Sequence, residues 1–235
     1  MRRFGALGLW LGQLSAMDGI AQKNLHLQVF LCRFRHLRKV RLIGKVALFN
    51  LCLGFPMSGS ALIIIDMQQG LFADRLPDDY AAVLQRLQQL YLAAHDSQRP
   101  VIFVCHEAPD SILTFQSPGW QLVEGLQLGP SDLLVRKTTP DSFLRTDLQQ
   151  ILQQHHINRL VIAGYASEFC VDTTVRSAAA HGYAVDLVAD THTTHDKPHL
   201  TAANIRAHHN ATLAAVRSFG VKIRPVPAAE VVFAG

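Results

Sequence analysis

The sequence predicts an α/β fold: a three-layer, doubly wound, mostly parallel six-stranded sheet with helices on both faces, of the Rossmann-like type. Short, continuously apolar runs alternate with helical patterns from residue 57 onward. Continuous apolar character indicates strands covered on both faces, as in a parallel sheet. The alternation of strands and helices implies right-handed crossovers. A chain of 235 residues with 49% apolar side chains is long enough to bury one such core.

The predicted strands, in chain order, are 61–65, 101–105, 133–135, 160–163, 184–188 and 221–223. The predicted helices are 79–95, 146–155, 168–181 and 201–219. Apolar residues recur at helical spacing from Val83 to Ala94. Thr146 and Gln149 have the spacing of a capping box, and Gly220 is placed as a C′ glycine after the last helix. We therefore expect one domain, without internal repeats.

Charge divides the chain near residue 56. Residues 1–56 hold nine Lys and Arg side chains and one acid, whereas residues 57–235 are mildly acidic. The apolar runs 4–17 and 46–57 are shorter than the roughly 18–20 residues that span a bilayer. We interpret 1–56 as a basic N-terminal extension, disordered or an artefact of the start site, with a targeting segment or a basic binding element as alternatives. Function is therefore sought in 57–235.

The acidic balance of 57–235 lacks the one-sided basic face that phosphate binding requires, so we expect no nucleic-acid partner. We expect no membrane association of this domain either. Four cysteines, Cys32, Cys52, Cys105 and Cys170, show no CxxC spacing, which does not indicate a disulfide framework or a zinc knuckle. A reducing, cytoplasmic location suits this pattern and a free thiol.

Three chemically reactive side chains fall at the ends of predicted strands. Asp66 ends the first strand, Lys137 follows the third and Cys170 lies just past the fourth. Ligands of doubly wound folds bind beyond the carboxyl ends of the strands. The topology alone therefore predicts that these three residues converge on one edge of the sheet.

Their chemistry is that of nucleophilic catalysis. Ser167 is a predicted N-cap, which places Cys170 at about N3, where the helix dipole and the cation of Lys137 are expected to lower the pKa of the thiol below about 8.5. Asp66 is a candidate to take the thiol proton and later to activate water. The turn 164–167 is a candidate source of backbone N–H groups for an oxyanion hole.

The segments LIIIDMQQGLF, VRKTTPDSF and AGYASEFCVDTTVRSAAAHGYAVDLVADTHTT resemble the isochorismatase-like cysteine hydrolases, which include nicotinamidases and N-carbamoylsarcosine amidohydrolases. The resemblance covers 57–235. It implies that Asp66 is the general base, Lys137 the thiolate-stabilising cation and Cys170 the nucleophile. It further implies a cis peptide between Tyr165 and Ala166, and an oxyanion hole formed by the N–H groups of Ala166 and Cys170.

What the resemblance implies for function is hydrolysis of an amide-type C–N bond in a small-molecule substrate, without a cofactor, by a homo-oligomer, a dimer or a tetramer. Three alternatives stay open. The first is a non-catalytic binding or scaffolding member of the same fold, and the second is a vinyl-ether hydrolase that does not need Cys170. The third is a thiol sensor. A sensor normally has a resolving cysteine nearby, and none is evident.

The predicted substrate pocket draws on the loops around these strand ends. Its candidate lining residues are Gln68, Phe72, His106, Trp120, Tyr165 and Glu168. Cys105 is the rival nucleophile, but neighbouring strand residues point to opposite faces, and we interpret it as a buried strand cysteine.

We expect no metal. Nicotinamidases carry metal ligands near the second strand, where this chain reads VCHEAPDSILTFQ and offers only His106. His192, His195 and His199 have spacings compatible with a metal face but no carboxylate partner, and we interpret them as polar loop and helix-start residues. His208, His209 and Asn210 are interpreted as packing or interface residues of the last helix, and the alternative is that they hold a site residue in place.

Overall fold

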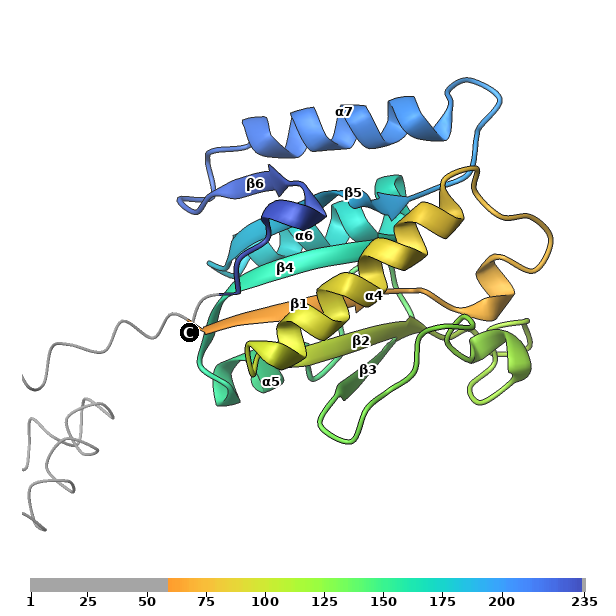
Figure 1. The fold of residues 1–235 in the computed structure, drawn as a ribbon, viewed down its shortest axis with the longest axis horizontal. Coiled ribbons are helices and arrows are strands. Elements are labelled where there is room, and N and C mark those ends of the chain that lie inside the picture. Colours follow the sequence, from red (N-terminus) through yellow and green to blue (C-terminus); the bar gives the residue numbers. More distant parts are fainter. Residues whose placement is uncertain (1–58, 234–235) are drawn as a thin grey trace, which may run out of the picture. The chain divides into compact units, whose positions relative to one another are not determined.

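The structure is a computed structural model that describes residues 59–233 (Figure 1). The strands are β1 (Gly59–Ile65), β2 (Val101–His106), β3 (Leu133–Lys137), β4 (Ile157–Tyr165), β5 (Ala184–Thr193) and β6 (Ile223–Val226). The helices are α4 (Tyr80–Asp96), α5 (Leu148–Gln154), α6 (Asp172–Ala180) and α7 (Ala202–Ala215), with short turns η1 (Gln69–Leu71), η2 (Pro118–Trp120), η3 (Ser167–Val171) and η4 (Ala228–Glu230). Our expectations for 1–56 lie outside the described residues.

The six strands form one sheet in the order β3-β2-β1-β4-β5-β6. Every neighbouring pair is parallel, which confirms the predicted doubly wound sheet. The chain moves outward from β1 to β3 and then returns to the other side of β1 with β4. The switch in strand order between β1 and β4 is where such folds open a crevice for ligands.

Alternate residues along the strands pack into two separate hydrophobic cores, one on each face of the sheet. In β1, Ala61, Ile63 and Ile65 pack with residues of α5, α6 and α7. Leu62 and Ile64 pack with residues of α4 on the opposite face. Figure 1 shows α4 in front of the sheet and α6 behind it. Continuous apolar strands are therefore explained by burial on both sides. Within residues 59–233, no helix combines the length and the apolar character needed to cross a membrane.

The last helix and strand differ from the prediction. The helix α7 ends at Ala215 rather than at residue 219, because Val216 adopts an extended backbone with ψ of 106°. Gly220, at φ of 79°, therefore lies in the connecting turn and is not the C′ glycine. The strand β6 begins at Ile223, where its register with β5 starts, whereas the sequence predicted 221–223.

The predicted capping box is also wrong. Asp147 is the N-cap of α5, without a side-chain cap. The hydroxyl of Thr146 donates to the carbonyl of Ser142 at 2.6 Å and accepts weakly from Leu148 N at 3.3 Å. The Oε1 atom of Gln149 is buried without a partner. The Thr146 side chain is thus engaged with the preceding turn and with Leu148 N, and it does not form a capping box with Gln149.

Candidate active site

Three strand ends bring their side chains together at the carboxyl edge of the sheet. Lys137 Nζ lies 2.7 Å from Asp66 Oδ2, 3.2 Å from Cys170 Sγ and 3.1 Å from His106 Nδ1. Asp66 directly follows β1, His106 and Lys137 end β2 and β3, and Cys170 lies in η3 after β4. The convergence predicted from topology is therefore present, with His106 as a fourth member.

The centre of this cluster is a buried ion pair. Lys137 is 1% exposed and Asp66 is 2% exposed. An isolated charge is costly to bury, so each partner makes the burial of the other possible. Asp66 also has a backbone φ of 51°, and its N–H donates to Val104 O at 2.8 Å. This bond ties the carboxylate to β2, so its position is set by the sheet.

The pKa of the Cys170 thiol is raised, whereas the sequence predicted that it would be lowered. Burial, and then the negative charge of Asp66, raise its pKa to about 12, and the opposing effect of Lys137 is smaller. The expectation of a lowered pKa is wrong, because it considered the cation and the helix dipole without desolvation and the carboxylate. The resting cluster is therefore a neutral thiol beside an ion pair.

The turn that carries Cys170 has unusual backbone geometry. The Tyr165–Ala166 peptide is cis, as the family resemblance implied. Residues 167–171 form a π-helical turn rather than the first turn of an α-helix. The carbonyl of Ala166 accepts the N–H groups of Phe169 at 3.0 Å and Val171 at 3.2 Å, the residues on either side of Cys170. The N3 assignment of Cys170 is thus wrong.

Ser167 is not an N-cap but the end of a buried hydrogen-bond chain. Its Oγ lies 2.7 Å from His192 Nδ1, and His192 Nε2 lies 3.0 Å from Asn210 Oδ1. Asn210 Nδ2 donates to Ala189 O at 2.9 Å, so its Oδ1 accepts and His192 carries its proton on Nε2. Ser167 therefore donates to Nδ1. Both Ser167 and His192 are fully buried, so this chain holds the nucleophile turn and is closed to substrate.

Local sequence patterns do not predict this chain, since they indicate a helix cap for Ser167, a loop for His192 and packing or an interface for Asn210. The available signal was a run of polar residues, 190–194, at the end of an otherwise apolar strand. Such a run in a buried strand implies buried partners, but it does not identify them.

Burial lowers the pKa of His192 from 6.5 to about 4. The unfolded chain therefore binds this proton at a higher pH than the folded chain, and the free energy of unfolding falls as pH drops from 6.5 toward 4, by about 3 kcal/mol in full. His192→Gln should reduce the slope of stability against pH in this window, measured by urea unfolding at several pH values. The exposed His199→Gln is the control and should keep the slope. An unchanged slope in His192→Gln would refute the assignment.

Among the predicted pocket residues, Gln68 has a structural role. It is fully buried. Its Nε2 donates to the carbonyls of His106 at 2.9 Å and Trp120 at 3.0 Å, and its Oε1 accepts from His106 N at 2.7 Å. Both amide hydrogens and the carbonyl are thus engaged. Gln68 positions the ends of β2 and η2 beside β1, and its side chain has no free donor for a substrate.

Phe72 and Tyr165 form an aromatic group next to the nucleophile turn. Their ring centroids are 4.9 Å apart in an edge-to-face arrangement. Tyr165 Oη lies 2.9 Å from His195 Nδ1, and His195 Nε2 lies 2.8 Å from Arg75 O. His195 therefore donates to the carbonyl and accepts from Tyr165. Burial, and then Glu168, raise the pKa of Tyr165 to about 12, so the hydroxyl keeps its proton.

Trp120 and Glu168 each have a buried polar atom without a partner among the described residues, the indole Nε1 and the carboxylate Oε2. Trp120 packs edge-on against Phe115 at 5.0 Å. The other oxygen of Glu168 accepts from Thr194 Oγ1 at 2.8 Å and pairs with Lys197 Nζ at 3.0 Å. Their contact with a substrate stays a prediction.

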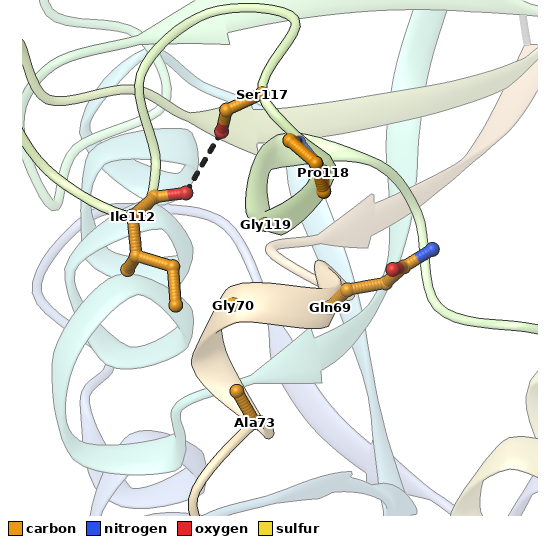
Figure 2. Close-up of a pocket in the computed structure, with 7 residues that line it drawn as sticks. All are labelled: Gln69, Gly70, Ala73, Ile112, Ser117, Pro118 and Gly119. Carbon is orange, nitrogen blue, oxygen red and sulfur yellow. Dashed lines mark hydrogen bonds between the residues drawn. The ribbon is translucent and has the colours of Figure 1, made fainter.

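A hollow of about 430 Å³ lies beside these loops, between η1 and η2 (Figure 2). Its lining residues are Gln69, Gly70, Ala73, Ile112, Ser117, Pro118 and Gly119. A Cβ on Gly119 would lie 2.3 Å from Ile112 O, so only glycine permits this close approach of the two loops. Figure 2 shows Ser117 hydrogen-bonded to the same carbonyl, at 2.9 Å. The hollow includes none of the cluster residues and results from loop packing.

The cluster contains three side chains of the kinds that bind metal ions. Ligand atoms of Asp66, His106 and Cys170 lie within 4.8 Å of one another, close enough to hold a metal ion. Lys137 Nζ, however, contacts all three residues, and an ammonium has three protons to donate. The ammonium thus takes the place at which a metal would bind these atoms. The expected absence of a metal remains a prediction that this geometry favours.

The fold and the cluster together define a class: α/β proteins with a thiol beside a buried ion pair at the carboxyl edge of a parallel sheet. Comparison with known proteins identifies the family within it. A model of the isochorismatase domain matches residues 60–219, and the chain belongs to the isochorismatase family.

Two relatives and one solved structure illustrate the similarity. The chain is 33% identical over 141 residues to streptothricin hydrolase of Streptomyces noursei, covering 59% of this chain and 51% of that protein. It is 36% identical over 59 residues to the ureidoacrylate amidohydrolase RutB of Agrobacterium fabrum, covering 25% and 26%. The crystal structure of an isochorismatase family protein superposes with a TM-score of 0.66 at 36% identity, covering 72% of this chain and 99% of that one. The chain spans about half the length of the streptothricin hydrolases that it matches.

Proposed function

We propose that this chain is a hydrolase of a small molecule and that it cleaves an amide-type C–N bond with Cys170 as nucleophile. The observation that carries the proposal is the position of Lys137 Nζ, which contacts both Asp66 Oδ2, at 2.7 Å, and Cys170 Sγ, at 3.2 Å, inside the protein. The relatives support the reaction class, since streptothricin hydrolase and ureidoacrylate amidohydrolase are by name a hydrolase and an amidohydrolase.

In the first step, Asp66 takes the proton from Cys170 Sγ, and the sulfur attacks the substrate carbonyl carbon. The transfer moves a negative charge from the carboxylate to the sulfur beside the cation of Lys137. The net charge of the buried cluster does not change, which avoids the cost of burying a new charge. A thiol whose pKa is raised in the resting protein is thus converted to a thiolate only as it reacts.

The tetrahedral intermediate carries its negative charge on the former carbonyl oxygen. The N–H groups of Ala166 and Cys170 are the proposed donors to this oxygen. The intermediate collapses, the C–N bond breaks, and the leaving nitrogen takes the proton held by Asp66. Asp66 then takes a proton from water as the water attacks the thioester. The C–S bond breaks, Asp66 returns that proton to the sulfur, and the products are the free thiol and a carboxylic acid, which loses its proton to solvent.

The test is to trap the thioester. The protein is incubated with small primary amides, N-carbamoyl amino acids and ureas, quenched in acid, and measured by intact mass and peptide mapping. We expect an acyl adduct on Cys170 with a turned-over compound, and neither adduct nor turnover in Cys170→Ala. Cys105→Ala is the matched control, since Cys105 is a buried strand residue of β2.

Other outcomes separate the alternatives. Turnover of a vinyl ether that survives Cys170→Ala would identify the vinyl-ether reaction in place of amide hydrolysis. Binding of a compound without turnover, unchanged by Cys170→Ala, would identify a binding module.

A further inference from the structure

His106 is the member of the cluster to which the proposed mechanism gives no role. One imidazole nitrogen lies within 4.8 Å of both Cys170 Sγ and an oxygen of Asp66. The backbone of His106 is held on both sides by Gln68, with hydrogen bonds of 2.7 Å to its N–H and 2.9 Å to its carbonyl. The half-buried ring is therefore presented to the reacting groups from a rigid strand end.

The contact with Lys137 determines which nitrogen of this ring carries the proton. Lys137 Nζ lies 3.1 Å from Nδ1 of His106. An ammonium has no acceptor, so Nδ1 must accept and the proton of the neutral ring is on Nε2. Burial, and then the charge of Lys137, lower the pKa of His106, which keeps the ring neutral. The ring is thus a donor at Nε2, polarised by the ammonium at its other nitrogen.

This donor has no protein acceptor. Nε2 of His106 has no partner among residues 59–233 and is not one of their fully buried polar atoms, so it borders accessible space. The cluster therefore presents one unused N–H, on a ring that has a nitrogen within 4.8 Å of Cys170 Sγ. Hydrogen-bond donors placed beside a reacting centre select substrates with a matching acceptor, because a substrate without one leaves the donor unpaired.

We propose that His106 is a substrate-binding residue whose Nε2–H donates to an acceptor oxygen, a carbonyl or a carboxylate, that the substrate carries next to the scissile carbonyl. The inference rests on Cys170 being the nucleophile and deepens the proposed function by naming the substrate class. A substrate with an ammonium or N–H group at this position is disfavoured, since two donors would face each other.

Alkylation of Cys170 tests this without knowledge of the substrate. Iodoacetamide carries a carbonyl next to its reacting carbon, iodoacetate a carboxylate, and iodoethane no acceptor. The rate with each oxygen-bearing reagent is divided by the rate with iodoethane at pH 9, and modified Cys170 is identified by mass. A change in the pKa of Cys170 cancels in this ratio.

We expect His106→Phe to lower the ratio by about 2- to 10-fold for the preferred oxygen-bearing reagent, the loss of one hydrogen bond. His106→Gln retains an amide N–H and should keep most of the ratio, and the exposed His199→Phe should leave it unchanged. The reagent with the larger loss distinguishes a carbonyl from a carboxylate. If the ratio is unchanged in His106→Phe, the inference about His106 is overturned, but the assignment of Cys170 as the nucleophile is not affected. A wild-type Cys170 that no reagent modifies removes the proposed nucleophile and the inference with it.

The tautomer is an independent measurement on the wild-type protein. Imidazole ¹⁵N chemical shifts between pH 6 and 8 should show His106 protonated at Nε2 and unprotonated at Nδ1. A proton on Nδ1 overturns the inference, whether or not His106→Phe folds.

Discussion

Asp66→Asn should lower turnover strongly and at the same time make Cys170 more reactive toward alkylation. Turnover is expected to fall by about 10²- to 10⁴-fold, because the amide cannot take the thiol proton or activate water. The charge of Asp66 raises the pKa of Cys170, so removing it increases the thiolate fraction. A nearby charge shifts a pKa by about 1–3 units, and the lower nucleophilicity of the weaker base offsets about half of that gain, which leaves a rate increase of roughly 3- to 30-fold.

The measurement is the rate of alkylation of Cys170 by iodoacetamide between pH 7 and 10, beside turnover of the compound found in the trapping screen. Asp74→Asn removes an exposed carboxylate from the same loop region and should change neither rate. Lys137→Met should lower both rates, because Lys137 lowers the pKa of the thiol. If Asp66→Asn slows alkylation as well as turnover, the resting cluster is not a thiol beside an ion pair.

Gly164→Ala should destabilise the domain by more than about 4 kcal/mol. A Cβ at this position would lie 2.2 Å from Ile65 O and 2.7 Å from Ile65 N, both backbone atoms of the neighbouring strand. The backbone φ of Gly164 is 126°, which side chains rarely adopt. Relief of the clash requires β4 to move away from β1, and this is the strand pair that carries Asp66 and the Cys170 turn.

The matched control is Gly182→Ala. Gly182 also has a positive φ, 88°, but a Cβ there meets nothing within 4 Å. It should cost only the conformational strain, about 1–2 kcal/mol. Urea unfolding of both variants separates the steric effect from the backbone effect, and equal losses would contradict the steric explanation.

Much of the site was predictable because topology alone places strand ends. Asp66, Lys137 and Cys170 follow three different apolar runs, and a parallel sheet brings the carboxyl ends of such runs to one edge. His106 was predicted only as a pocket residue, because nothing local indicates that its Nδ1 meets Lys137, 31 residues away. The Ser167–His192–Asn210 chain was missed for the same reason.

The sequence by itself determined the fold class and the order of parallel strands and helices. It also determined that Asp66, Lys137 and Cys170 lie together at the sheet edge. These follow from patterns that are local in the chain: continuous apolar runs, helical spacing and a reactive residue at a run's end. Only the tertiary structure decided the ionisation of Cys170, the tautomers of His106 and His192, and the π-helical turn that replaced a predicted helix start. Desolvation and Coulomb interactions change within a few ångströms, and those distances are set by packing between segments that are far apart in the sequence.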